Sequence, residues 1–335
     1  MRKPLRASIV FLVILFTALS ILSFISAKND RPLFYAKLLW SLAISCLGFC
    51  IYRSGTISRY RSILFILIAF FFFLEFKLFR FLSFTSAASP YCHIAQAPTL
   101  LNFIYSQFLA LAGGGWRVWG ALTLGFLWLG IMFTIGQGIC SWVCFYGGID
   151  EACSKIARKP LVRLKIPRPW RDFPIAFLIF LLIVSFLQGL PVFCVWFCPF
   201  KMTAVLFWPV LIGFVIILPI LTKKRTFCSL ICPFGALVSI CGKVSPYRVI
   251  INKEKCIRCG KCLDACPVFA IENKGPDEYK ISNFCNMCGK CIDVCPADAI
   301  NILYRQIFIF LALLVTGVIS GSFVPRLLLQ LIGLK

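Results

Sequence analysis

Seven long apolar stretches limit what this chain of 335 residues can fold into. A helix of about 20 apolar residues crosses the hydrocarbon core of a lipid bilayer, which is roughly 30 Å thick. Only 14% of the residues are charged, whereas about a quarter of the residues of a soluble domain carry a charge. We therefore expect a polytopic membrane protein with an all-α membrane domain of about seven transmembrane helices. They are predicted near residues 8–27, 33–52, 62–84, 118–139, 173–193, 202–221 and 307–324.

The first stretch shares one feature with signal peptides, because Arg2, Lys3 and Arg6 precede it. It is long for the apolar region of a signal peptide, and no clear small-residue cleavage site precedes Lys28. We therefore predict that it is retained as a helix.

Basic residues gather in alternate connections between the apolar stretches. The N-terminus and the second, fourth and sixth connections contain Arg2, Lys3, Arg6, Arg53, Arg59, Arg61, Lys155, Arg158, Lys159, Arg163, Lys165, Arg168, Arg171, Lys223, Lys224 and Arg225. Cytoplasmic loops of membrane proteins carry such an excess. The pattern predicts a multi-pass protein of the bacterial cytoplasmic (inner) membrane, with the N-terminus and residues 250–302 in the cytoplasm and the C-terminus outside.

The same distribution explains the formal net charge of +23. Residues 250–302 hold equal numbers of basic and acidic side chains, so the excess lies on the predicted inner face of the membrane domain. Lipid headgroups attract such a face. The sequence contains neither a concentrated basic patch nor a nucleic-acid recognition motif, so we expect no nucleic-acid partner.

Two matched cysteine runs follow the sixth apolar stretch, and each reads C-x2-C-x2-C-x3-C-P. In this spacing three thiolates bind one iron–sulfur cluster and the fourth binds the other cluster. Isolated C-x2-C pairs would suit zinc, but zinc does not explain two matched runs of four. The spacing predicts two [4Fe-4S] clusters. The expected ligand sets are Cys256, Cys259, Cys262 with Cys295, and Cys285, Cys288, Cys291 with Cys266.

This segment resembles a bacterial-type two-cluster ferredoxin, a small α+β fold. The resemblance implies an inserted ferredoxin module and three parts of the chain. They are a transmembrane domain at 1–249, the cytoplasmic module at 250–302 and a C-terminal transmembrane helix at 303–335.

Three further cysteine pairs share the spacing C-x3-C near the ends of the predicted helices. Two thiols four residues apart lie on one face of a helical turn, and a following proline ends or redirects the helix. Such a turn offers two thiolates to one metal centre, although a buried free cysteine is also an ordinary small apolar residue. The pairs are Cys140/Cys144, Cys194/Cys198 followed by Pro199, and Cys228/Cys232 followed by Pro233.

Together with the two runs, these pairs resemble the membrane polyferredoxins of the NapH, NosR and YccM type over roughly residues 130–300. The resemblance implies electron transfer among quinols, cytoplasmic donors and partner redox proteins. The first pair departs from the family pattern, because Phe145 follows it where the family has proline. Residues 1–115 carry no recognised motif, so the partner is not implied.

The predicted topology sorts the pairs into two candidate metal centres. Cys140, Cys144, Cys228 and Cys232 fall at the inner ends of helices and are expected to form one centre. Cys194 and Cys198 fall on the outer side, where Cys92 and His93, the only histidine, are their candidate companions. Iron–sulfur, heme, another metal or none at all stays open for both centres. Four other cysteines are expected to be core or idle residues, although the first two are alternates for the inner centre: Cys46, Cys50, Cys153 and Cys241.

Glu75 lies inside the third apolar stretch, and an ionisable group at membrane depth is a functional candidate. It would accept a proton at a quinol site, or it pairs with a cation such as Arg117. Lys77 and Arg80 reach the outer surface in that second interpretation.

Three functions remain open from the sequence. The first is an electron-transfer subunit of a membrane redox complex, with no catalytic residues of its own and with other subunits, or a soluble ferredoxin or flavoprotein, as partners. The second is a quinol or quinone oxidoreductase subunit. The third is a redox maturation or metal-handling factor for a partner metalloenzyme. Motifs for nucleotides, flavin, covalent heme attachment and catalytic triads are absent from the sequence.

Overall fold

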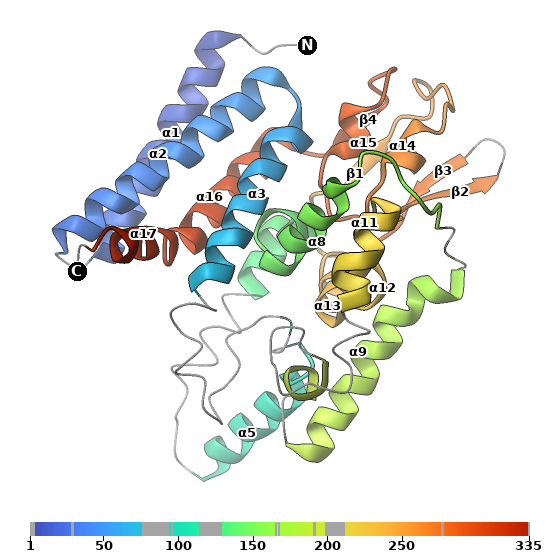
Figure 1. Cartoon of the computed structure of the whole chain (residues 1–335), viewed down its shortest axis with the longest axis horizontal. Coiled ribbons are helices and arrows are strands. Elements are labelled where there is room, and N and C mark those ends of the chain that lie inside the picture. The colour runs from blue at the N-terminus through green and yellow to red at the C-terminus, as the bar shows by residue number, and fades with distance from the viewer. Residues whose placement is uncertain are drawn as a thin grey trace.

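The computed structural model describes residues 4–27, 30–75, 94, 97–113, 129–164, 166, 168–189, 192–197, 212–275 and 278–333. These residues form a largely helical protein with a small α+β module between its last helices (Figure 1). The longer helices are α1 (Leu5–Ala27), α2 (Arg31–Ser54), α3 (Ile57–Leu74), α5 (Leu100–Ala112), α8 (Phe145–Ile156), α9 (Arg168–Gln188), α13 (Pro233–Cys241), α16 (Arg305–Ser320) and α17 (Val324–Ile332). The short helical turns are η3 (Gly136–Gly138), α7 (Ile139–Trp142), η4 (Phe193–Phe197), η5 (Gly213–Ile217), α11 (Leu218–Thr222), α12 (Thr226–Leu230), α14 (Lys261–Ala265) and α15 (Lys290–Asp293).

Helix boundaries follow local chemistry in the N-terminal hairpin. The side chain of Asp30 accepts a hydrogen bond from the backbone N–H of Leu33 and so caps the start of α2. The helix ends at Gly55, which adopts the left-handed conformation at φ 73°. Helices α1 and α2 then pack side by side, and α16 packs against both.

Five helical segments of the described residues are long and apolar enough to cross a membrane. They are Leu5–Ala27, Arg31–Ser54, Ile57–Leu74, Leu129–Ile156 and Trp170–Gln188. A mostly helical fold with several long apolar helices is therefore confirmed, whereas the predicted total of seven transmembrane helices stays a prediction. The second half of the predicted third stretch and parts of the predicted fourth and sixth stretches lie outside the described residues.

Two segments differ from the predicted boundaries. The fourth stretch does not end near residue 139, because the apolar segment runs on to Ile156, with a break between α7 and α8 at Val143 and Cys144. The last stretch, at 307–324, falls on α16, and a second apolar helix, α17, follows it at a bend of 41°. Pro325 lies in the first turn of α17, where its missing N–H costs least, and it cannot continue the preceding helix.

The α+β module contains two antiparallel strand pairs. Strand β1 (Val249–Ile251) pairs with β4 (Ile300–Ile302), so Val249 lies opposite Ile302 and the two ends of the module meet. Strand β2 (Ile271–Gly275) pairs with β3 (Glu278–Ile281). Figure 1 shows the module beside one end of α3, and α15 packs directly against that helix.

Candidate functional site

The first cysteine run surrounds a recess of about 350 Å³ in the module. Cys256, Cys259 and Cys262 line it together with Cys295 from the second run. The structure therefore brings one predicted ligand set together. The backbone N–H of Ala299 donates to Sγ of Cys295 at 3.4 Å, which is a contact that stabilises negative charge on sulfur.

A second recess of about 330 Å³ contains the other predicted set. Cys285, Cys288 and Cys291 line it together with Cys266 from the first run. The backbone N–H of Ala270 donates to Sγ of Cys266 at 3.2 Å, which repeats the contact at Cys295. Burial raises the pKa of the Cys285 and Cys291 thiols above the ordinary value, so iron must displace protons when it binds there.

Two of the C-x3-C pairs, Cys140/Cys144 and Cys228/Cys232, make up a third cysteine group, here called the inner quartet. In each pair a short helical turn, α7 or α12, contains the first cysteine, and the second cysteine stands at the N-cap of the following helix. Cys232 Sγ accepts a hydrogen bond from the Gly235 N–H at 3.4 Å. Pro233 opens α13, whereas Phe145 opens α8 in the same position of the motif.

The two pairs lie close enough for their charges to interact. Burial raises the pKa of the Cys232 thiol, and the neighbouring Cys144 and Cys140 raise it further. Nη2 of Arg225 contacts both pairs, because it donates to the carbonyl of Cys140 at 2.7 Å and to Sγ of Cys228 at 3.4 Å. The two pairs therefore lie next to each other.

Among the described residues, no group of three or more Cys, His, Asp or Glu side chains is close enough to hold one metal ion. The thiolates of an iron–sulfur cluster bind different irons at separate corners of a cube, so they stand farther apart than the ligands of one zinc ion.

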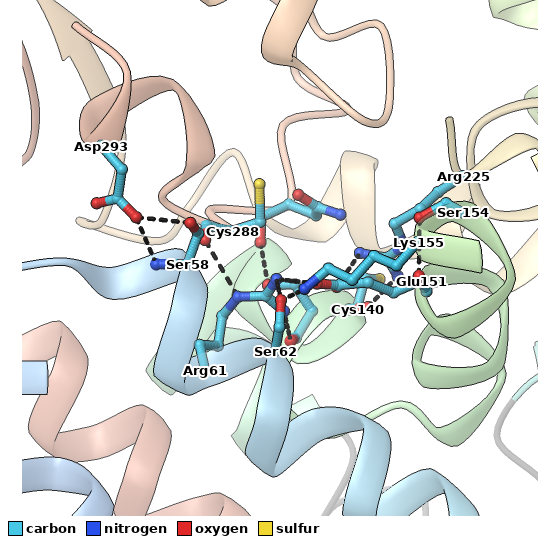
Figure 2. Close-up of polar contacts among 12 residues, drawn as sticks. Ser58, Arg61, Ser62, Cys140, Glu151, Ser154, Lys155, Arg225, Cys288 and Asp293 are labelled. Carbon is cyan, nitrogen blue, oxygen red and sulfur yellow. Dashed lines mark hydrogen bonds and ion pairs between the residues drawn. The ribbon is translucent and has the colours of Figure 1, made fainter. Parts of the chain in front are cut away.

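A buried set of charged side chains joins the second recess to the inner quartet (Figure 2). Arg61 is 2% exposed and donates from Nη2 to both carboxylate oxygens of Glu151, at 2.6 and 2.8 Å. The same guanidinium donates to the backbone carbonyl of Cys288 at 3.1 Å and to that of Ser141. Arg61 therefore contacts a cysteine of the module and the neighbour of Cys140 at once.

Arg225 supports the quartet from the other side. It is fully buried and donates to the carbonyl of Cys140 at 2.7 Å and to Sγ of Cys228 at 3.4 Å. Asp150 accepts a hydrogen bond from the N–H of Cys228 at 2.9 Å. Nearby acidic groups and thiolates raise the pKa of Arg225, so it stays a cation.

Comparison with known proteins places these cysteines in two protein families. Residues 248–297 match a family described as a 4Fe-4S dicluster domain. A family described as a 4Fe-4S binding domain matches three further segments, at 117–169, 173–202 and 204–249, and each of them contains one C-x3-C pair.

Relatives among curated proteins share this combination. YccM of Escherichia coli is 25% identical over 153 residues, which is 41% of this chain and 43% of YccM. The methylamine utilization ferredoxin-type protein MauN of Paracoccus denitrificans is 28% identical over 190 residues, covering 50% of this chain and 65% of MauN. The regulatory protein NosR of Pseudomonas aeruginosa is 25% identical over 167 residues, covering 45% of this chain and 23% of NosR. The chain belongs to the membrane polyferredoxins of the NapH, NosR and YccM type.

The polyferredoxin is thus an iron–sulfur protein of electron transport. Its matched segments span less than two thirds of each of these three relatives. No solved structure matches it.

The predicted outer centre falls largely on residues that the structure does not describe. Cys92, His93 and Cys198 lie outside the described residues, and Cys194 lies in η4 without a described side chain. Of the cysteines predicted to be core or idle, Cys153 is buried, Cys50 and Cys241 are half-buried, and Cys46 is exposed. Glu75 lies at the end of α3 and is 5% exposed, whereas Lys77, Arg80 and Arg117 lie outside the described residues.

Sequence reasoning missed the buried charges beside the inner quartet. Arg61 and Arg225 were counted only among the basic residues of the inner face, and Asp150 and Glu151 were not singled out. A signal was present, because two adjacent carboxylates follow Cys144 within an apolar stretch that reaches Ile156.

Proposed function

We propose that the polyferredoxin is an electron-transfer subunit of a membrane redox complex. It relays electrons between a carrier on the cytoplasmic side and a partner in or across the membrane. The observation that carries this proposal is the position of Arg61, which contacts the carbonyls of both Cys288 and Ser141. The module and the inner quartet are therefore neighbours through one buried side chain.

In this proposal each cysteine group holds one [4Fe-4S] cluster. The recesses would be filled through Cys256, Cys259, Cys262, Cys295 and through Cys266, Cys285, Cys288, Cys291, and the inner quartet would hold a third cluster. Bound clusters take up and release single electrons. The protein's part is to exclude water from Cys288 and Cys291, which are buried, and to donate N–H groups to sulfur.

The proposed domains and orientation follow the sequence. Residues 1–249 would form a transmembrane domain, 250–302 the cytoplasmic module and 303–335 a C-terminal transmembrane part, in the inner membrane of a bacterium. The uneven distribution of Lys and Arg supports this orientation. Relatives named for methylamine utilization and for regulation support a place in a larger redox system, without naming the partner of this chain.

Iron quantitation on anaerobically purified protein tests the proposal. Three clusters require about twelve irons per chain, and a fourth, outer centre would raise this to about sixteen, whereas the module alone requires about eight. Cys228→Ser should remove about four irons and leave the spectrum of the module unchanged. Cys241→Ser is the matched control, because Cys241 is also a free thiol, at the last residue of α13, but lines neither recess. About eight irons in the unaltered protein would remove the inner centre from the proposal.

A quinone site is a second candidate, and the burial of Glu75 at the end of the apolar helix α3 favours it. Glu75→Gln should then abolish reduction of the clusters by quinol and leave their reduction by dithionite intact. The metal-handling alternative depends on Cys194 and Cys198 and stays a prediction.

A further inference from the structure

The two cysteine runs of the module have equivalent positions that face different surroundings. Aligning Cys256 with Cys285 pairs Ile257 with Asn286, Arg258 with Met287, Cys259 with Cys288 and Asp264 with Asp293. The local backbone agrees, because Gly260 and Gly289 are both left-handed, at φ 71° and 79°, and each precedes a short helix. The same loop therefore occurs twice.

In the second run this loop packs against the membrane domain. Asn286 and Met287 are 4% and 3% exposed. The backbone carbonyl of Asn286 accepts a hydrogen bond from Ser141 Oγ at 2.5 Å. Two residues later, the backbone carbonyl of Cys288 accepts a hydrogen bond from Arg61. Asp293 accepts from the backbone N–H groups of Ile57 and Ser58, at 3.1 and 2.8 Å, and so caps α3. The second run therefore uses this face to contact α3 and the segment that contains Ser141.

In the first run the corresponding face is open. Ile257 is 64% exposed, and Arg258 and Asp264 are also exposed. Cys259 is the only exposed cysteine among the eight of the two runs, all of which the structure describes. Helix α3 packs against the second run, whereas Ile257 in the first run stays largely exposed beside the exposed Cys259.

Charge indicates what would cover this open loop. Lys253, Lys255, Arg258 and Lys261 are exposed around Cys259, against the exposed acids Glu254 and Asp264. A surface of one dominant sign steers partners of the opposite sign and raises their rate of association. The surroundings of the open loop thus suit an acidic partner with an apolar contact at its centre.

We propose that residues 253–261 form the docking surface for a small acidic one-electron carrier. This inference rests on the proposed function and adds the surface at which electrons enter. On contact the reduced carrier loses one electron and the module gains it, and no bond or proton is exchanged. Electrons then enter on the side of Cys259, and the side of Cys288 faces the inner quartet.

Binding of an acidic plant-type [2Fe-2S] ferredoxin to the full chain in nanodiscs tests the proposal. The double variant Lys255→Glu/Lys261→Glu should weaken binding at least about tenfold at low salt and flatten the dependence of Kd on salt concentration. Ile257→Asn, which installs the residue of the second run, should weaken binding without changing the salt dependence. Iron content should equal that of the unaltered protein in both variants.

The matched control is Lys159→Glu/Arg163→Glu, which makes the same change of charge at two exposed residues of the basic tract before α9. It should weaken binding less than the loop variant does, because the two residues lie outside the proposed surface at 253–261. Equal loss in the control and the loop variant, or affinity that follows only the anionic lipid content of the nanodisc, would overturn the docking surface. A deficit of iron in the unaltered protein would instead overturn the proposed function, whatever the binding result.

Discussion

Arg225 donates a hydrogen bond from its guanidinium to Sγ of Cys228, over 3.4 Å, in a fully buried setting. Its other neighbours are the ring of Phe65, 5.5 Å from the guanidinium carbon, and a carboxylate oxygen of Glu151 at 3.9 Å. A buried cation beside thiolate ligands favours the more negative, reduced state of a metal centre. Arg225 is therefore placed to raise the reduction potential of a centre held by the inner quartet.

Replacing Arg225 should lower that potential. In Arg225→Met the cation is lost, and in Arg225→Lys the charge stays while the contacts to Cys140 and Cys228 are weakened, so the methionine variant should show the larger decrease. The measurement is a redox titration followed by paramagnetic resonance of the inner centre. Lys223→Met controls for loss of a nearby cation, since Lys223 donates to the backbone carbonyl of Arg158 at 2.9 Å and should leave the potential unchanged. Equal potentials in all three variants would contradict the assigned role.

The ion pair of Arg61 and Glu151 should be costly to break on one side. Glu151→Gln leaves Arg61 with an uncompensated buried charge, and breaking a buried pair in this way costs about 3–5 kcal/mol. We expect that loss in the free energy of unfolding, measured by denaturant titration in detergent.

The double variant Arg61→Met/Glu151→Met supplies the comparison. Replacing both charged partners by apolar side chains should recover part of the lost stability. The double variant also lacks the contact between Arg61 and the Cys288 carbonyl. We therefore expect hydrogen exchange at 285–291 to be faster in the double variant than in the unaltered protein. A double variant that loses as much stability as Arg61→Met and Glu151→Met lose together when measured singly would show that the two side chains do not stabilise each other.

Asp293 should stabilise the start of α3, because it caps that helix from a distant part of the chain. Asp293→Ala should cost about 1–2 kcal/mol and speed hydrogen exchange at Ile57 and Ser58. Asp264→Ala is the matched control at the equivalent, exposed position of the first run, and its cost should stay below about 0.5 kcal/mol. Similar losses in the two variants would mean that capping does not hold the module on α3.

The grouping of the module cysteines was predictable, because it depends on spacing within about forty residues and on a proline after each run. The recesses then collect the same two sets of four. Similar reasoning assigns the two pairs of the inner quartet to one centre, since they fall at corresponding helix ends, and this assignment stays a prediction. In both cases the local spacing of cysteines carries the information.

The contacts between these groups were not predictable from spacing. Arg61 and Glu151 are 90 residues apart in the chain, and a basic residue near a helix end is explained equally well by the inner membrane surface. Burial decides between these interpretations, and burial depends on how α3 packs against α8 and α15. The orientation of the module, with one run covered and the other open, has the same origin.

Two equivalent glycines allow the contact between the module and α3 to be tested by itself. Gly260 and Gly289 are both left-handed, at φ 71° and 79°, so alanine at either position pays a similar backbone cost of about 1–2 kcal/mol. A Cβ at Gly289 would also lie 2.7 Å from Cβ of Ile57, whereas a Cβ at Gly260 would meet only the Tyr279 hydroxyl at 3.7 Å. Gly289→Ala should therefore lose more stability than Gly260→Ala.

The excess loss should have a specific location. Ile57 is fully buried at the start of α3, so a displaced loop in Gly289→Ala should speed hydrogen exchange in the first turn of α3, whereas Gly260→Ala should leave that turn protected. The difference between the two variants isolates the packing of the second run on α3 from the backbone strain that they share. Equal exchange in that turn in the two variants would mean that the module adjusts without moving away from α3. The close approach of Gly289 to Ile57 would then play no part in holding the second recess beside the inner quartet.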